Sequence, residues 1–193
     1  MTSSESRIGS ESRIGSALKF APVIETERLR LRGHRADDLA ACLPLWNDPI
    51  VTRFIGGRPY TQEEVWQRVQ RYAGSWVLLG HGFWVIEDKA STKLVGEIGI
   101  MDAKRDIEPP FGDDRELGWA LMPDAHGKGY ASEALAAVLA WERQAFDAPH
   151  VVALIDPDNA PSIRLAEKFG FSERVRSVYK GVPTIQFERR RSV

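Results

Sequence analysis

Apolar and polar residues alternate with a period of two in several short stretches of the chain. In residues 26–33, Leu29 and Leu31 alternate with arginines, a pattern that predicts a half-buried β-strand. Runs rich in β-branched and aromatic residues predict six further strands, at residues 82–88, 94–101, 115–122, 150–155, 174–180 and 184–190.

The apolar spacing lengthens to the helical period in four other segments, at residues 37–46, 61–72, 130–146 and 160–169. Thr61 with Glu64 three residues later forms a capping box, which marks the start of the second helix. The pair Asp48–Pro49 is expected to end the first helix in a turn.

The order of these elements is strand, two helices, three strands, helix, strand, helix and two strands, which predicts an α/β domain. Residues 82–101 are expected to form a hairpin, and residues 174–190 a second one. The helices at 130–146 and 160–169 are crossovers, and these require parallel neighbouring strands. A chain of 193 residues, 43% of them hydrophobic, is long enough for one domain with a sizeable core.

The first 20 residues lack this patterning. The hexapeptide ESRIGS at residues 5–10 is repeated at once at residues 11–16. Two short polar copies are too few to stack as a solenoid. We therefore predict that residues 1–20 form a disordered tail or a remnant of expression, with a partner-binding motif as the alternative, and that the domain spans residues 21–193.

Charge and cysteine content narrow the classes of partner. A net charge of −1 provides no overall basic field, so neither nucleic acid nor an anionic membrane is expected as a partner. No apolar run approaches the roughly 18 residues of a membrane span, and no signal-like segment opens the chain. The single cysteine, Cys42, lies in the apolar run LAACLPLW and is expected to be a buried thiol. These features predict a cytoplasmic protein.

Candidate chemistry is concentrated in AHGKGYASEAL, residues 125–135, where a strand gives way to a helix. Glycines at the start of a helix expose backbone N–H groups at the positive end of the helix dipole, which favours an anion. The Walker P-loop does not fit, because it needs a glycine where Met122 stands and a serine or threonine where Gly129 stands. The dinucleotide fingerprint does not fit either, because Ser132 replaces its last glycine.

Two longer stretches carry a family resemblance. The segment ELGWALMPDAHGKGYASEAL is followed, after one helix and one strand, by DPDNAPSIRLAEKFGF, and together they resemble the GNAT superfamily of acyl-CoA-dependent N-acetyltransferases. The opening ETERLRLR and the ending EKFGF are similar to the ribosomal-protein alanine acetyltransferase branch. The resemblance covers about residues 21–190. It implies a single-domain GNAT fold, with a mixed central sheet of about seven strands splayed in the middle and about four flanking helices.

The resemblance implies acetyl-CoA as the co-substrate. The family's pyrophosphate turn, Arg/Gln-x-x-Gly-x-Gly/Ala, is matched at two of its three places, since a histidine replaces the first residue. The implied phosphate-binding residues are His126, Gly127, Lys128, Gly129, Tyr130 and Ala131. The pantetheine arm is implied to lie as an extra strand along the main chain of Trp119, Ala120 and Leu121, with Asn159 and Ser162 contacting the cofactor from the next helix. A plain helix N-cap is the alternative role for Asn159.

Direct attack of an amine on a thioester needs a base, a donor to the oxyanion and an acid for the leaving thiolate. Family precedent places the oxyanion donor in the backbone around Ala120 and Leu121. Many members have a tyrosine acid where this chain has Ala166, so Ser162, one turn earlier, is the implied acid, with a structural role as the alternative.

The expected base is Glu116, which opens the strand 115–122. Glu97, in the otherwise apolar strand 94–101, and a water chain are the alternatives. No metal ion is expected.

The acceptor site is expected around the loop that follows the first helix. Its candidate residues are the loop residues Phe54, Gly56, Gly57 and Tyr60, the tryptophans Trp46, Trp84 and Trp119, and the acidic residues Asp106, Glu108, Asp113 and Asp114. Core packing is the alternative for the tryptophans, and simple solvation is the alternative for the acidic loop.

The predicted function is transfer of an acetyl group from acetyl-CoA to a primary amine, which is either a small molecule or a protein N-terminus. A polyamine, an aminoglycoside and a free amino acid stay open as small acceptors, and so does a homodimer. Two alternatives belong to other classes: a GNAT-fold module that binds CoA without transfer, and a regulator that binds ATP at the glycine turn.

Overall fold

The structure, a computed structural model, describes residues 20–146 and 150–190. The repeat in the predicted tail lies outside the described residues. No helix within the described ranges combines the length and the apolar character needed to cross a membrane.

One mixed sheet organises the described chain, with the strand order β1-β2-β3-β4-β5-β6-β8-β7. Its strands are β1 (Ile24–Glu25), β2 (Leu29–Arg32), β3 (Phe83–Asp88), β4 (Leu94–Met101), β5 (Arg115–Leu121), β6 (His150–Ile155), β7 (Ser172–Tyr179) and β8 (Val182–Arg190). All seven predicted strands are present, and both predicted hairpins form, β3 with β4 and β7 with β8. The additional strand, β1, has only two residues, too few to show a period in the sequence.

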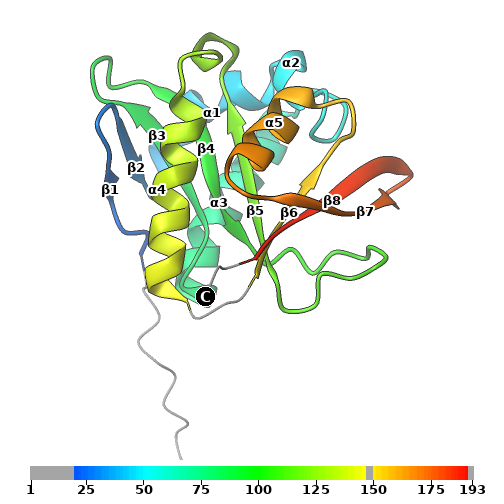
Figure 1. Cartoon of the computed structure of the whole chain (residues 1–193). Helices are drawn as coiled ribbons and strands as arrows, with labels where there is room; N and C mark the ends of the chain where they lie inside the picture. The colour runs from blue at the N-terminus through cyan, green and yellow to red at the C-terminus, as the bar shows by residue number, and fades with distance from the viewer. Residues whose placement is uncertain (1–19, 147–149, 191–193) are drawn as a thin grey trace, which may run out of the picture.

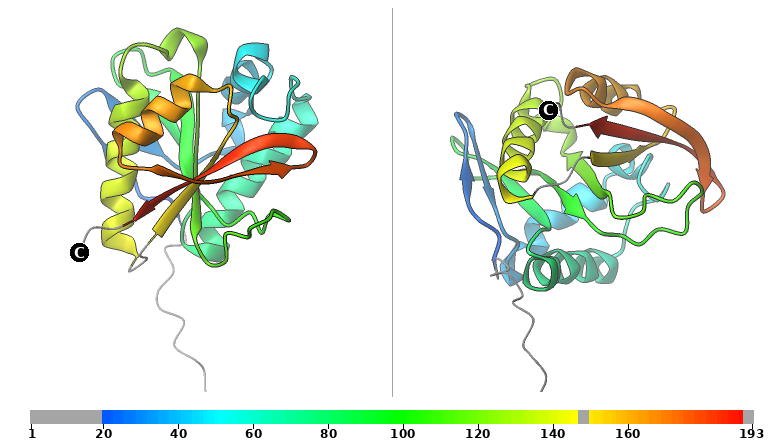
Figure 2. Two further views of the ribbon diagram at one scale, coloured as in Figure 1. Left: turned by 45° about the vertical axis from the view of Figure 1, so that its right-hand side comes forward. Right: turned by 60° about the horizontal axis from the view of Figure 1, so that its bottom comes forward.

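Helices cover both faces of this sheet. They are α1 (Leu39–Trp46), α2 (Pro49–Thr52), α3 (Gln62–Leu79), α4 (Tyr130–Ala145) and α5 (Ala160–Lys168). Figures 1 and 2 show α4 and α5 on one face and α1 with α3 on the other. The predicted capping box begins α3, because Thr61 Oγ1 accepts from the Glu64 N–H and the Glu64 carboxylate accepts from the Thr61 N–H.

Asp48 and Pro49 do not form the simple turn that the sequence predicted. The first helix already ends at Trp46, and Asp48 is the N-cap of the short helix α2. Its Oδ1 accepts from the Ile50 N–H at 2.7 Å, and Pro49 occupies the first helical position, where its missing N–H costs nothing.

Both predicted crossover helices join parallel strands, but only the strands joined by α4 are neighbours in the sheet. This helix joins β5 to β6, which pair in parallel. The helix α5 joins β6 to β7, but β8 lies between these two strands and pairs antiparallel with each. The last strand thus inserts beside β6, a pairing that the order of elements in the sequence does not reveal.

Strands β5 and β6 separate soon after they begin, as the family resemblance implied. Their ladder contains only the pairs Arg115 with Val151 and Glu116 with Val152. Beyond it, β5 stays paired with β4 and β6 stays paired with β8. Within the described chain, residues 117–121 therefore have one edge that is not paired with another strand.

Two hydrophobic clusters fill the space on the two faces. The larger one packs the sheet against α4 and α5, and it includes the fully buried Trp84. The smaller one packs Cys42 and Trp46 with the side chain of Ala120 beneath α1 and α3. Cys42 is buried, as predicted, and burial together with the neighbouring Glu97 raises the pKa of its thiol.

Candidate functional site

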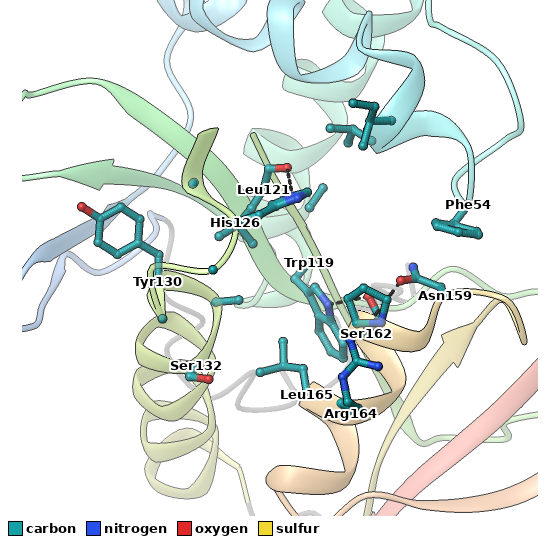
Figure 3. A pocket seen from close by; sticks show the side chains of 18 of the residues that line it. Phe54, Trp119, Leu121, His126, Tyr130, Ser132, Asn159, Ser162, Arg164 and Leu165 are labelled. Atoms are coloured by element: carbon teal, nitrogen blue, oxygen red, sulfur yellow. Dashed lines mark hydrogen bonds between the residues drawn. The ribbon is translucent and has the colours of Figure 1, made fainter. Parts of the chain in front are cut away.

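A cavity of about 570 Å³ lies beside the separated part of β5. Its walls come from α2 and the loop after it, from the end of β5, from the glycine turn with the start of α4, and from the first turns of α5 (Figure 3). The lining residues that the sequence also singled out are Phe54, Trp119, Ala120, Leu121, His126, Gly127, Gly129, Tyr130, Ala131, Asn159 and Ser162.

The glycine turn gives this cavity a wall of backbone. Gly127 and Gly129 have φ angles of 72° and 80°, in the left-handed region that favours glycine, and Gly129 is the N-cap of α4. The first helical hydrogen bond runs from the Glu133 N–H to the Gly129 carbonyl. The N–H groups of the three residues before Glu133 therefore have no helical acceptor, and they lie at the positive end of the helix dipole. This arrangement suits a phosphate or another anion.

His126 uses its side chain to hold the turn. Its Nε2 lies 3.0 Å from the Leu121 carbonyl oxygen, and because that oxygen can only accept, Nε2 carries the proton and donates. The ring therefore ties the turn back to the end of β5. Lys128 is exposed and is the one residue of the implied turn that does not line the cavity.

Ser162 and Asn159 lie across the cavity from the turn, at the start of α5. Asn159 is the N-cap of this helix, since its Oδ1 accepts from the Ser162 N–H at 3.3 Å, and it also lines the cavity. Trp119 Nε1 lies 3.2 Å from Ser162 Oγ. An indole N–H can only donate, so Ser162 Oγ accepts this bond and its own hydroxyl hydrogen stays available to a group in the cavity.

Glu116 does not join these residues at the main cavity. It lies at the start of β5 and borders a second cavity of about 260 Å³. Its carboxylate accepts two hydrogen bonds from Arg105, at 2.5 Å from Nε and 2.7 Å from Nη2. To act as a base it would have to give up part of this bidentate pair.

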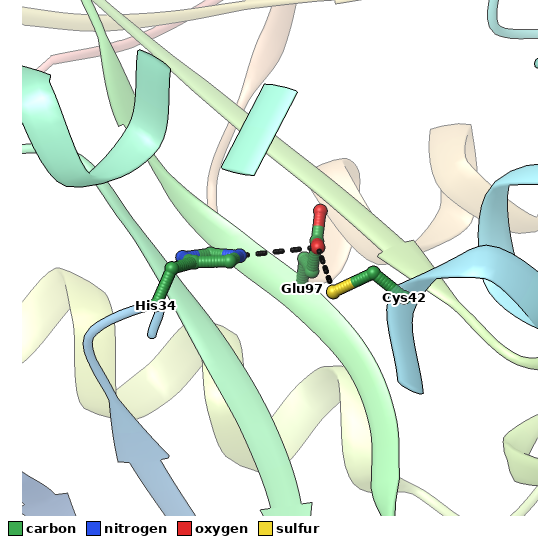
Figure 4. A group of neighbouring side chains, drawn as sticks. All are labelled: His34, Cys42 and Glu97. Carbon is green, nitrogen blue, oxygen red and sulfur yellow. Dashed lines mark hydrogen bonds and ion pairs between the residues drawn. The ribbon is translucent and has the colours of Figure 1, made fainter. Parts of the chain in front are cut away.

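Glu97 is completely buried, next to the main cavity. It pairs across β4 and β5 with Ala120, a residue that lines that cavity, but Glu97 is not itself among the lining residues. Its Oε1 lies 3.1 Å from His34 Nε2 and 3.3 Å from Cys42 Sγ (Figure 4). Its Oε2 accepts from Trp46 Nε1 at 3.0 Å.

The ligand-type atoms of His34, Cys42 and Glu97 lie within 4.8 Å of one another, a set that Zn²⁺ accepts elsewhere. A histidine bound to a metal normally donates its second ring N–H to an acceptor, but His34 Nδ1 has no hydrogen-bond partner in the described structure. A hydrogen-bonded network centred on Glu97 explains the cluster without a metal ion.

The predicted acceptor residues divide between the cavity and the core. Phe54 lines the main cavity together with Ile50 and Ile55. Tyr60 stacks on Trp46, with ring centres 5.6 Å apart, and neither ring is among the lining residues. Gly56 and Gly57 both have positive φ angles in the loop between α2 and α3.

The acidic residues of the loop 103–114 do not line the main cavity. Asp114 borders the second cavity instead, and its Oδ2 lies 3.7 Å from Arg174 Nη1. Asp106, Glu108 and Asp113 are exposed, as the solvated alternative expected.

The chain matches known proteins over most of its length. A model of the acetyltransferase (GNAT) domain matches residues 28–172. The protein YkkB of Bacillus subtilis (strain 168) is 32% identical over 175 residues, which cover 86% of this chain and 94% of that protein. The uncharacterized N-acetyltransferase YoaA of the same species is 27% identical over 153 residues, covering 79% and 84%.

Solved structures are similar as well. A Bordetella pertussis protein described as a GNAT-family acetyltransferase superposes with a TM-score of 0.78 at 30% identity, covering 88% of this chain and 99% of that one. The ribosomal-protein-S5-alanine acetyltransferase of Vibrio fischeri gives a TM-score of 0.66 at 19% identity, covering 88% and 97%, which is a likeness of fold alone.

Proposed function

The chain belongs to the GNAT acetyltransferase family, and from this premise we propose that it transfers the acetyl group of acetyl-CoA to a primary amine by direct attack. The observation that supports the proposal best is the convergence on one cavity of an unpaired strand edge, a glycine turn at a helix N-terminus and the Ser162 hydroxyl.

The residues around the cavity fit acetyl-CoA. The edge of β5 beyond Glu116 offers free backbone groups to the amides of a pantetheine arm, in the manner of an added strand. The turn at Gly127 and Gly129 offers N–H groups and the α4 dipole to a pyrophosphate. When bound, acetyl-CoA supplies an activated thioester.

The chain itself supplies hydrogen-bond donors on two sides of the cavity. The N–H of Leu121 is the proposed donor to the acetyl oxygen, where negative charge develops during attack, because alternation along β5 turns the backbone groups of Ala120 toward β4. The Ser162 hydroxyl, whose hydrogen is not used by Trp119, is the proposed acid for the leaving sulfur.

For the base we prefer Glu97 to Glu116. Glu97 is the cross-strand partner of Ala120, so its carboxylate lies one strand away from the proposed oxyanion donor, and because it does not itself line the cavity it would act through a water. Glu116 is held by Arg105 at the second cavity.

The lining of the cavity favours an acceptor with an apolar body. Its acceptor side consists of Ile50, Val51, Phe54 and Ile55, and no carboxylate lines the cavity in the described structure. A polyamine or an aminoglycoside would bring several positive charges without partners. A peptide N-terminus with a small first residue fits better, and the fold neighbour named as a ribosomal-protein-S5-alanine acetyltransferase makes such peptides the first acceptors to test.

The test is release of free thiol from acetyl-CoA in the presence of an amine panel. The panel contains peptides that begin with Ala or Ser, free amino acids, a polyamine and an aminoglycoside. Release with the peptides above the rate of simple hydrolysis supports the proposal. Tight CoA binding by calorimetry without thiol release for any amine would identify a non-catalytic CoA-binding module instead.

A further inference from the structure

Arg28, which precedes β2, contacts the glycine turn at Lys128, a residue 100 positions further along the chain. Its Nη1 donates to the Lys128 carbonyl oxygen at 2.8 Å, and its Nε and Nη2 both lie 2.7 Å from Glu133 Oε2. The guanidinium carbon also lies 4.8 Å from the centre of the Tyr130 ring. One side chain thus joins the turn to the first turn of α4.

The contact with Lys128 orients a peptide unit. The carbonyl of Lys128 and the N–H of Gly129 belong to the same planar trans peptide, so they point in opposite directions. Because Arg28 holds the carbonyl oxygen, the Gly129 N–H points away from Arg28. The same arginine lies where a side chain on Gly129 would begin, since a Cβ there would be 3.3 Å from Arg28 Nη2.

The contact with Glu133 balances a charge. Glu133 is the acidic residue in the first turn of α4, and its Oε1 also accepts from Thr26 Oγ1 at 2.6 Å and from the Arg28 N–H at 2.8 Å. Burial raises the pKa of Glu133, but the hydrogen bonds from Thr26 and Arg28 outweigh it and hold the pKa below its ordinary value. Glu133 is therefore ionised at neutral pH, at the helix end where a pyrophosphate is proposed to bind.

Without a cation beside it, the Glu133 carboxylate would offset the positive end of the helix dipole and repel a bound pyrophosphate. The guanidinium of Arg28 removes this conflict, because its two nitrogens on one carboxylate oxygen compensate the charge locally.

We propose that Arg28 is a positioning residue of the cofactor site, which orients the Lys128–Gly129 peptide and neutralises Glu133 so that the start of α4 keeps its attraction for a pyrophosphate. The inference rests on the proposed function, because it assumes a phosphate-bearing cofactor at this turn. Arg28 acts through its neighbours and needs no contact with the cofactor itself.

The first measurement is CoA affinity by calorimetry, with the KM for acetyl-CoA and kcat measured alongside. Arg28→Met should weaken CoA binding about tenfold or more, through lost charge-assisted hydrogen bonds, and should raise KM more than it lowers kcat. Arg28→Lys keeps the positive charge but loses the planar guanidinium with its several N–H donors, so it should weaken CoA binding less than Arg28→Met does. Arg30→Met is the matched control, because Arg30 forms its ion pair with the exposed Glu25 on β1, so the variant should leave affinity unchanged.

Glu133→Gln separates charge balance from a simple structural tie. If Glu133 must be neutralised, Glu133→Gln alone binds CoA as well as the native chain, and Arg28→Met costs much less affinity in the Glu133→Gln background. Equal losses in both single variants, with no recovery in the double variant, would overturn the inference. Melting temperatures show whether any variant has lost its fold.

The two proposals fail in different ways. If the native chain binds CoA and Arg28→Met binds it equally well, only the inference about Arg28 is wrong. If the native chain binds no CoA, the proposed function is wrong and the inference falls with it.

Discussion

At the scale of single residues, the hydroxyl of Ser162 carries the sharpest catalytic prediction. Ser162 Oγ accepts a hydrogen bond from Trp119, so the hydrogen of its own hydroxyl is left for a group in the cavity. Ser162→Ala should lower kcat about a hundredfold, the lower range for a lost general acid, with little change in CoA affinity. Ser132→Ala is the control, because Ser132 lines the same cavity from α4, whereas Ser162 lines it from α5 beside Trp119. If Ser162→Ala keeps the native kcat, this serine has only a structural role in α5.

The choice between the two carboxylates is tested by kinetics. Glu97→Gln should lower kcat about a hundredfold, as expected when a general base is lost. Glu116→Gln should leave kcat nearly unchanged, because Glu116 is engaged by Arg105 away from the main cavity. The reverse result would return the role of base to Glu116. Because the amide introduced by Glu97→Gln would face the indole donor of Trp46, a melting curve must accompany the kinetics.

Gly129 is predicted to be the most sensitive residue of the turn. A valine at a φ of 80° is strained, and its Cβ would meet Arg28 Nη2 at 3.3 Å, so the turn would shift and misdirect several N–H groups together. Loss of two such hydrogen bonds to a charged ligand weakens CoA binding by about a hundredfold or more. Gly181→Val is the control for strain, since Gly181 has a φ of 81° with open space around it, between β7 and β8.

Lys128→Ala gives the comparison that decides how the turn works. It removes one exposed charge and should reduce CoA affinity far less than Gly129→Val. A larger loss in the lysine variant would mean that the turn binds by side-chain charge rather than by its backbone.

Motifs made of neighbouring residues were predicted from the sequence, whereas contacts between residues far apart in the chain were not. The turn and the two helix starts are local motifs that are visible in the sequence, and the family resemblance implied that the turn, the end of β5 and the start of α5 form one site. The sequence could not reveal that Arg28 balances Glu133 or that Arg105 holds Glu116, since those contacts depend on how segments far apart in the chain fold together. The contact that a side chain on Gly129 would make with Arg28 is hidden from the sequence for the same reason.

At the scale of elements, α3 offers a direct test of a local signal. Thr61 caps its first turn and completes the box with Glu64. Thr61→Ala should lower the free energy of unfolding by about 1 kcal/mol without affecting CoA affinity, because the cap lies outside the main cavity. Thr92→Ala is a control on an exposed turn, where the hydroxyl only bonds to the neighbouring Ser91 carbonyl. Urea unfolding measures both, and an unchanged midpoint for Thr61→Ala would show that the box does not stabilise α3.

Helices and strands whose apolar residues recur with a clear period were predicted. The structure differs from the prediction where a segment is too short to show a period or where a pairing joins distant strands. The pair Asp48–Pro49 suits a turn and a helix start equally well, and only the hydrogen bonds from Ile50 and Val51 show that it begins α2. The insertion of β8 beside β6 is a pairing between strands that are not neighbours in sequence order.

At the scale of the whole molecule, Arg32 joins three elements through buried charge. It donates to both oxygens of Asp38, just before α1, at 2.7 Å each, and to Glu87 on β3 at 2.6 Å. The side chains of Arg32 and Asp38 are only 9% and 6% exposed. Burial raises the pKa of Asp38, but the hydrogen bonds from Arg32 and from the Arg35 N–H outweigh it, so the pKa is lower than its ordinary value.

The sign of the pH dependence follows from that direction. Asp38 binds its proton less readily in the folded chain than in the unfolded chain, where its pKa is about 3.9. Its contribution to stability is therefore complete above about pH 5 and is lost as the pH falls through the folded-state pKa.

Asp38→Asn should lower the free energy of unfolding at pH 7 by about 3–5 kcal/mol, because a buried guanidinium loses its main partner. The same variant should lose less stability than the native chain between pH 5 and pH 3. Glu173→Gln is the matched control, since Glu173 forms an exposed pair with Arg176 and should leave the curve nearly unchanged. Urea unfolding at a series of pH values measures all three chains, and an equally steep acid loss in Asp38→Asn would show that other carboxylates govern acid unfolding.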